Sequence, residues 1–170
     1  MKKLLVMDAA NYDPGMDEIL RVAVRAIAFV EGKLLLIGSK FGELKFPGGG
    51  QEPGESDEET LIRETMEETG YRVIPESICP FGEVEEKRLS THEPMIWHQI
   101  NRYYFCDVEP TKNGCSYTDS EKKYGFHQVF HTLEEAIRIN EEMIAAEGEQ
   151  PWNQREYTVL KLIRENLTDH

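Results

Sequence analysis

The sequence predicts an α/β fold in which helices and strands pack in layers. Two observations favour it: candidate strands rich in branched and aromatic residues alternate with helices that carry capping signals, and the two types follow one another in mixed order. An α+β arrangement of the same layers stays open at this point. No internal repeat, low-complexity segment or linker divides the chain, so we expect a single domain over residues 1–170, long enough to bury a core.

The first part of the chain is predicted to be an N-terminal extension, residues 1–19, followed by a β-hairpin. Val, Ile, Ala and Phe dominate Arg21–Val30, and Glu31-Gly32 is a tight-turn signal before the next strand. The predicted elements are, in order, a short strand at Lys2–Met7, a turn at Asp13-Pro14-Gly15, strands at Arg21–Val30 and Lys33–Ile37, and a loop at Gly38–Leu44.

Three helices are predicted from their end signals. They run from Ser56 or Asp57 to Thr69, from Thr132 to about Ala146, and from Pro151 to about Asn166. Ser56 or Asp57 supplies the first N-cap, Thr132-Leu133-Glu134-Glu135 is a capping box, and Gly70 and Gly148 act as C-terminal stops. Proline is well suited to the first turn of the last helix.

Extended segments are expected between the first and second helices. Tyr103-Tyr104-Phe105 is typical of a pleated, half-buried surface. The predicted segments are strands at Arg72–Ile74, Ile78–Leu89, Ile96–Val108 and Val129-Phe130, with a polar loop from Glu109 to about Tyr124 that contains an Asn113-Gly114 turn.

Charge and cysteine content narrow the function classes. The formal net charge of −13 disfavours non-specific nucleic-acid binding, and an anionic substrate would need a divalent cation between itself and the carboxylates. The three cysteines, Cys79, Cys106 and Cys115, form neither a disulfide framework nor a CxxC zinc motif. No stretch is long and apolar enough to span a bilayer, and Asp8 ends the short apolar run at the N-terminus, so we expect a cytoplasmic protein without a membrane partner.

The segment between Phe46 and Tyr71 holds the candidate chemistry. On a helix that advances about 100° per residue, Glu64, Glu67 and Glu68 share an arc of roughly 100°. The apolar face expected nearly opposite consists of Ile62, Thr65, Met66 and Thr69. Three carboxylates this close repel one another, and a hard divalent cation with oxygen ligands would offset that repulsion. The competing interpretation is an ordinary solvated helix face.

The loop before this helix favours a binding role. Gly48-Gly49-Gly50 allows close backbone approach to a ligand and positive φ, and Gly54-Glu55 places another carboxylate just before the helix. A Walker phosphate loop is excluded because no Gly-Lys-Ser/Thr follows. Glycines, a carboxylate and a carboxylate-lined helix together indicate a site for a metal beside a phosphate chain.

At these residues the sequence resembles the Nudix hydrolase family, whose signature is G-x5-E-x7-R-E-U-x-E-E-x-G-U, with U a bulky aliphatic residue. The matching positions are Gly49, Glu55, Arg63, Glu64, Glu67, Glu68 and Gly70. The two U positions depart, being Thr65 and Tyr71, which puts core packing in doubt more than chemistry. A looser resemblance covers roughly residues 20–165.

The resemblance implies an α/β/α sandwich around a mixed sheet and the hydrolysis of a diphosphate linked to another group, usually a nucleoside, with Mg²⁺ or Mn²⁺. It implies that Glu64, Glu67 and Glu68 are metal ligands, that one of them can act as base, and that the Gly48 carbonyl is a further ligand. Glu55 would stabilise the loop or reach the metal through water, and Arg63 would orient the carboxylates. Family members often draw another acid from a late loop, and Glu121 is the candidate here, against a plain solvated glutamate.

Several basic and aromatic residues are candidates for substrate contact. Lys40 and Lys45 flank the glycine loop, and Arg21 and Arg25 share one face of the first long strand. Each can contact phosphate, as can the backbone at Gly49 and Gly50, although surface solvation or ion pairing explains the basic residues equally well. Trp97 and Tyr103 can stack on a base, but aromatic strand residues more often belong to the core.

Three functions therefore compete. The leading hypothesis is a metal-dependent pyrophosphohydrolase whose partner is a small-molecule diphosphate, a nucleoside di- or triphosphate or a nucleoside diphosphate linked to another group. The alternatives are a catalytically silent nucleotide-binding domain and a non-hydrolytic diphosphate enzyme on the same scaffold. The sequence leaves the oligomeric state open, with a homodimer as one option.

Overall fold

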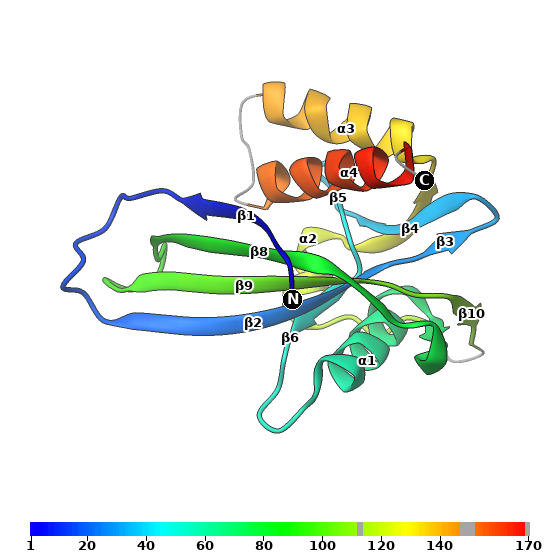
Figure 1. Cartoon of the computed structure of the whole chain (residues 1–170), viewed down its shortest axis with the longest axis horizontal. Helices are drawn as coiled ribbons and strands as arrows, with labels where there is room; N and C mark the ends of the chain where they lie inside the picture. Colours follow the sequence, from blue (N-terminus) through cyan, green and yellow to red (C-terminus); the bar gives the residue numbers. More distant parts are fainter. Residues whose placement is uncertain (112–113, 147–151, 169–170) are drawn as a thin grey trace.

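Strands form the middle layer of the molecule and helices cover both sides of it. The computed structural model describes residues 1–111, 114–146 and 152–168. Helix α1 (Asp57–Thr69) lies on one side of the strands, and α3 (Leu133–Ala145) and α4 (Asn153–Thr168) lie together on the other (Figure 1). The α/β/α sandwich implied by the resemblance is thereby confirmed.

The larger sheet has five strands in the order β1-β8-β9-β2-β6. Their bounds are β1 (Lys3–Asp8), β8 (Cys79–Leu89), β9 (Ile96–Phe105), β2 (Glu18–Ile27) and β6 (Gly48–Gly50). β1 runs parallel to β8 and β2 runs parallel to β9, whereas β8–β9 and β2–β6 are antiparallel, so the sheet is mixed as expected.

The remaining strands form two smaller groups. A four-stranded sheet has the order β11-β4-β3 with β5 also on β4, and β10 pairs with β7. Their bounds are β11 (His127–His131), β4 (Lys33–Gly38), β3 (Phe29–Val30), β5 (Leu44–Lys45), β10 (Val108–Pro110) and β7 (Tyr71–Val73), with a 3₁₀ turn at Pro75–Ser77. The predicted hairpin turn is present between β3 and β4, where Glu31 and Gly32 have φ of 50° and 79°.

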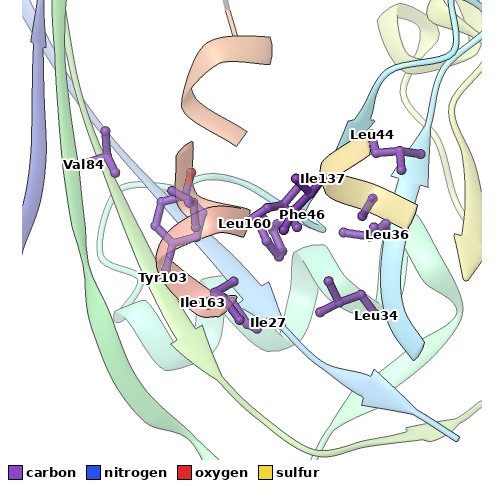
Figure 2. Close-up of a cluster of buried hydrophobic side chains, with 12 residues drawn as sticks. Ile27, Leu34, Leu36, Leu44, Phe46, Val84, Tyr103, Ile137, Leu160 and Ile163 are labelled. Carbon is purple, nitrogen blue, oxygen red and sulfur yellow. The ribbon is translucent and has the colours of Figure 1, made fainter. Parts of the chain in front are cut away.

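Alternating side chains divide the core into two clusters, one on each side of the strands. Leu34 and Leu36 of β4 face α3 and α4, while Leu35 faces the cluster that contains Leu61 of α1. Figure 2 shows the first cluster, in which Leu160 and Ile163 of α4 pack near the ring of Tyr103. Tyr103 is therefore a core residue, as its position in a strand favoured.

Several expectations from the sequence are corrected. The short strand predicted at Lys2–Met7 is confirmed as β1, but residues 1–19 belong to the sheet rather than to an extension, because β1 pairs in parallel with β8 and β2 already begins at Glu18. The predicted strand Arg21–Val30 divides at Ala28, where the chain passes from the larger sheet to the smaller one. The loop from Gly38 to Leu44 ends in β5, and the three glycines form strand β6 because they pair with β2.

The expected polar loop before Tyr124 contains a short helix, α2 (Asp119–Tyr124). Its capping box is Thr118 with Glu121, and Gly125 ends it in the left-handed conformation with φ of 68°. Thr132 caps α3 as predicted. Helix α4 ends at Thr168, two residues beyond the predicted end near Asn166. Asn113, Gly148 and Pro151, which carried turn and end signals, lie outside the described residues.

Across the described residues, no helix is long and apolar enough to cross a membrane.

Candidate active site

Helix α1 is fixed at both ends by short-range hydrogen bonds. Ser56 is the N-cap: its Oγ accepts from the Glu59 amide at 3.1 Å, and the Glu59 carboxylate accepts from the Ser56 amide at 2.7 Å. Gly70 ends the helix with φ of 71°. The predicted bounds are therefore confirmed, with Ser56 rather than Asp57 as the cap.

The face that α1 buries agrees with the expected one in part, since Thr65 and Thr69 are buried as predicted. Ile62 and Met66 are only half-buried, whereas Leu61 is fully buried and Glu68 is 1% exposed. One member of the carboxylate cluster, Glu68, thus lies on the buried side of the helix, while Glu64 and Glu67 stay partly exposed. Strand β6 accommodates two of the carboxylates, because the Gly48 amide donates to Glu68 and the missing side chain of Gly49 leaves room for Glu64.

Two of the glycines in β6 are required by close approach. A Cβ atom on Gly48, which has φ of 142°, would lie 2.0 Å from the backbone oxygen of Val24. A Cβ atom on Gly49 would lie 2.5 Å from the carboxylate carbon of Glu64. The Glu64 carboxylate therefore rests directly on the backbone of Gly49.

Glu68 is the most deeply buried of the three glutamates. Its Oε2 accepts from the Gly48 amide at 2.8 Å, and its Oε1 accepts from Lys45 Nζ at 3.1 Å. Burial raises the pKa of Glu68, and the charge of Lys45 opposes that rise. Lys45 thus reaches the carboxylate cluster from the strand that precedes the glycines.

Arg63 connects the other carboxylates. Its Nε and Nη2 donate to Glu55 at 2.6 and 2.8 Å, its Nη1 donates to Glu64 at 2.7 Å, and Glu67 lies 3.6 Å from Nη1. Hydrogen bonds from Arg63 and the Glu52 amide lower the pKa of Glu55 to about 2. Burial raises the pKa of Glu64 although Arg63 opposes it. The guanidinium therefore contacts all three of these carboxylates.

The donor set fits a hard divalent cation. Glu64 and Glu67 share a single guanidinium, and every candidate ligand is an oxygen atom, which Mg²⁺ and Mn²⁺ prefer. The Gly48 carbonyl is close to the same cluster but accepts from Arg25 Nη1 at 3.2 Å. In the conformation described, no three acidic, thiol or imidazole side chains of residues 1–111, 114–146 and 152–168 converge closely enough to hold a metal. Binding would require carboxylates to turn from Arg63 and Lys45 toward the cation.

Glu121 lies near this cluster but not in a loop. It is the third residue of α2, where its carboxylate accepts from the Thr118 amide at 2.7 Å. The pKa of Glu64 is raised mainly by burial, and the negative charges of Glu67 and Glu121 add to that rise. The tertiary structure thus brings Glu121 within electrostatic range of Glu64, while its own carboxylate serves as a helix cap.

A cavity of about 280 Å³ opens on the other side of β6. The floor is one face of β2, β8 and β9, and the wall comes from α2 and the start of α4. Five basic side chains line it: Arg21, Arg25, Lys45, Arg88 and Arg155. Four aromatic side chains line it as well: Trp97, Tyr124, Phe126 and Trp152. In a chain of net charge −13, this concentration of positive charge indicates an anionic ligand.

Only some of the basic residues proposed to contact substrate line the cavity. Lys45 and Arg25 line the cavity, and Lys45 links it to Glu68. Arg21 also lines it and lies against Gly50, where a Cβ atom would be 2.6 Å from its guanidinium. Lys40 is exposed in a turn, packs against Gly125 and takes no part in the cavity wall.

One buried network escaped the sequence interpretation. The Glu156 carboxylate accepts from the Phe46 amide at 2.7 Å, the Tyr103 hydroxyl at 3.0 Å and Arg155 Nε at 2.8 Å. Arg155 also donates to Glu86 at 2.6 Å, so α4 is tied both to the sheet and to the chain entering β6. Helical spacing offers a signal, since Glu156 falls on the same face as the apolar residues Leu160 and Ile163, which are buried.

The chain is similar in sequence to proteins of a known family. The NUDIX domain model matches residues 19–153. A Bacillus subtilis (strain 168) protein named "Putative 8-oxo-dGTP diphosphatase YtkD" is 33% identical over 102 residues, which are 60% of this chain and 60% of that protein. "Putative ADP-ribose pyrophosphatase YjhB" of the same organism is 32% identical over 86 residues, 50% of this chain and 40% of that protein. The chain therefore spans little more than half of one relative's length and less than half of the other's.

A solved structure supports the fold. The NUDIX hydrolase from Nitrosomonas europaea superimposes with a TM-score of 0.55 at 20% identity, covering 81% of this chain and 85% of that one. At that identity the likeness concerns the fold alone.

Proposed function

This chain belongs to the NUDIX family, and from that premise we propose that it is a metal-dependent pyrophosphohydrolase that cleaves the diphosphate linkage of a nucleotide. One observation carries the proposal: two carboxylates of α1, from Glu64 and Glu68, rest on the glycine strand whose other side adjoins the basic cavity. A diphosphate lying across β6 would have oxygen ligands for a cation on one side and basic side chains on the other.

We assign the residues to metal binding, positioning or phosphate binding according to their contacts. Glu64, Glu67 and Glu68, with the Gly48 carbonyl, would hold Mg²⁺ or Mn²⁺, and the cation would neutralise charge on the phosphate oxygens. Arg63 orients Glu64 and Glu67 through its contacts with both, and Glu55 anchors Arg63. Lys45 can exchange its contact with Glu68 for a phosphate oxygen without leaving the cavity wall.

The attacking water needs a proton acceptor. Burial raises the pKa of both Glu64 and Glu68, which makes each a stronger base than an exposed carboxylate. Glu121 is the remaining candidate, because its charge acts on Glu64 from α2. In that role it would have to release the Thr118 amide that it now caps.

The substrate proposal stays at the level of nucleotides. The names of the two relatives refer to different substrates, 8-oxo-dGTP and ADP-ribose, and they share a phosphate anhydride on a nucleoside. The cavity suits such a molecule, since basic groups can bind phosphate and aromatic rings can stack on a base.

A substrate panel with a matched pair of variants tests the proposal. Purified protein with Mg²⁺ or Mn²⁺ is incubated with nucleoside di- and triphosphates, ADP-ribose and dinucleoside polyphosphates, and phosphate products are quantified. We expect turnover on at least one substrate, its loss in EDTA, and a fall of about 10²-fold or more in Glu68→Gln. Glu58→Gln, an exposed position on the same helix, should retain full activity.

The same assay separates the alternatives. Unchanged turnover in Glu68→Gln would remove Glu68 from the site. A wild-type protein that binds metal and nucleotide but releases no product would be a silent binding domain, and conversion without phosphate release would indicate a non-hydrolytic enzyme.

A further inference from the structure

The outer end of the cavity is formed by three side chains from three neighbouring strands. Arg88 of β8 lies directly opposite Trp97 of β9, and Arg21 of β2 lies opposite Gln99, two residues further along β9. Because side chains alternate along a strand, all of them project from the same face of the sheet. The register therefore places two guanidinium groups beside one indole.

Both arginines lack a carboxylate partner among the described residues. Arg21 makes no hydrogen bond or ion pair there, and Arg88 donates only to the carbonyl of Leu89 at 3.2 Å. The deeper basic groups are neutralised: Lys45 by Glu68 at 3.1 Å, and Arg155 by Glu86 at 2.6 Å. Carboxylates are in excess in this chain, with 32 acidic residues against 19 basic ones, so the lack of a carboxylate partner at both arginines within the described part of the chain is notable.

Trp97 holds the two guanidinium groups in place. The Cζ atoms of Arg21 and Arg88 lie 5.6 and 5.7 Å from the centre of its ring, within the range of cation–π attraction. This contact costs the guanidinium groups none of their N–H donors, so they stay free to bind an anion. Three further aromatic side chains line the cavity and can stack on a base, namely Tyr124, Phe126 and Trp152.

The outer end adjoins the glycine strand on which the Glu64 carboxylate rests. Arg21 lies against Gly50, the last residue of β6, and Glu64 rests on the residue before it. A bound molecule can therefore touch the carboxylate site and the outer arginines at once.

We propose that Arg21 and Arg88, organised by Trp97, form a subsite for a phosphate group beyond the cleaved diphosphate. This inference rests on the proposed function and makes the preferred substrates nucleotides with at least one phosphate outside the cleaved linkage, such as nucleoside triphosphates or dinucleoside polyphosphates. The planar guanidinium fork binds phosphate oxygens in pairs, which a single point charge does not. ADP-ribose, whose two phosphates are those of the cleaved bond, would leave the subsite empty.

Binding of inorganic probes tests the subsite without turnover. Tripolyphosphate and pyrophosphate are titrated calorimetrically in EDTA into the wild-type protein, Arg21→Gln and Arg88→Gln. Arg72→Gln is the matched control, because Arg72 pairs with Glu109 on the separate β7–β10 ladder. We expect the wild-type protein to bind tripolyphosphate more tightly than pyrophosphate. Each cavity variant should weaken tripolyphosphate binding by about tenfold or more, and the control should leave it unchanged.

The outcomes separate this inference from the hydrolase proposal. Tripolyphosphate binding that is absent, no tighter than that of pyrophosphate, or unchanged in both cavity variants would overturn the subsite, even if nucleotides are hydrolysed. Loss of tripolyphosphate binding in the variants with no turnover of any nucleotide by the wild-type protein would support the subsite and refute the hydrolase. Where turnover is present, Arg88→Gln should raise KM for nucleoside triphosphates by a larger factor than KM for ADP-ribose.

Discussion

Replacing Glu156 by Gln should destabilise the protein far more than its distance from the carboxylate cluster suggests. Its carboxylate is fully buried and accepts three hydrogen bonds of 2.7 to 3.0 Å, from Phe46, Tyr103 and Arg155. Gln can still accept from Phe46, but its NH₂ group must face another donor, and Arg155 keeps only Glu86 as a charged partner. Breaking a buried ion pair from one side costs about 3–5 kcal/mol.

That magnitude is a large part of the total stability expected for a protein of this size, about 5–15 kcal/mol. Urea denaturation followed by circular dichroism at neutral pH measures it, with Glu134→Gln as control. Glu134 pairs with Arg164 at 3.4 Å on the surface, so its substitution should cost less than about 1 kcal/mol.

The pH dependence gives a second readout. Burial alone would raise the pKa of Glu156, but the charges of Arg155 and Arg25 outweigh it and the net pKa is lowered from 4.5. A lowered pKa contributes stability above the unfolded-state value, and that contribution is lost as the pH falls through the folded-state value. The difference in the free energy of unfolding between the wild-type protein and Glu156→Gln should therefore be largest at neutral pH. It should shrink on acidification below about pH 4.5. A difference under about 1 kcal/mol at pH 7, or one that does not change with acid, would refute this reasoning.

Two further pairs of variants separate stability from activity. Gly48→Ala places a Cβ atom 2.0 Å from a backbone oxygen of β2 and should lower the melting temperature sharply, whereas Gly49→Ala meets only the movable carboxylate of Glu64 and should retain the fold but lose turnover. Thermal melts and product assays on both proteins check this, and equal loss of stability in the two would contradict it. Glu121→Gln preserves the capping box with Thr118 and removes the charge, whereas Glu121→Ala removes both and should destabilise α2 by about 1 kcal/mol. If Glu121 takes part in catalysis, both variants lose activity; full activity in Glu121→Gln would limit it to a capping role.

The family could be predicted from the sequence because its signature depends on spacing along a short segment. Glu55, Arg63 and the glutamates that follow lie within a single turn and helix, so their relative positions are determined by local hydrogen bonds such as those of Ser56 and Gly70. The capping box at Thr132 and the hairpin turn at Glu31 were predictable for the same reason.

The buried side of α1 was predictable only in part from its own pattern. Periodicity pointed to Ile62, Thr65, Met66 and Thr69, of which the two threonines are buried, but the fold also encloses Glu68. A glutamate can take that position because strand β6 offers an amide donor and Lys45 offers a charge. Both come from a segment about twenty residues earlier that reaches the helix only in the folded chain.

By itself, the sequence determined the spacing of the glycines and carboxylates and the caps of helix α1, since these depend on neighbours within a few residues. Only the tertiary structure decided what surrounds them. The Phe46–Glu156 hydrogen bond spans 110 residues, and the parallel register of β2 on β9 brings Arg21 beside Trp97. Such contacts depend on how strands and helices pack, and this packing divides the site into a carboxylate side and a basic side across three glycines.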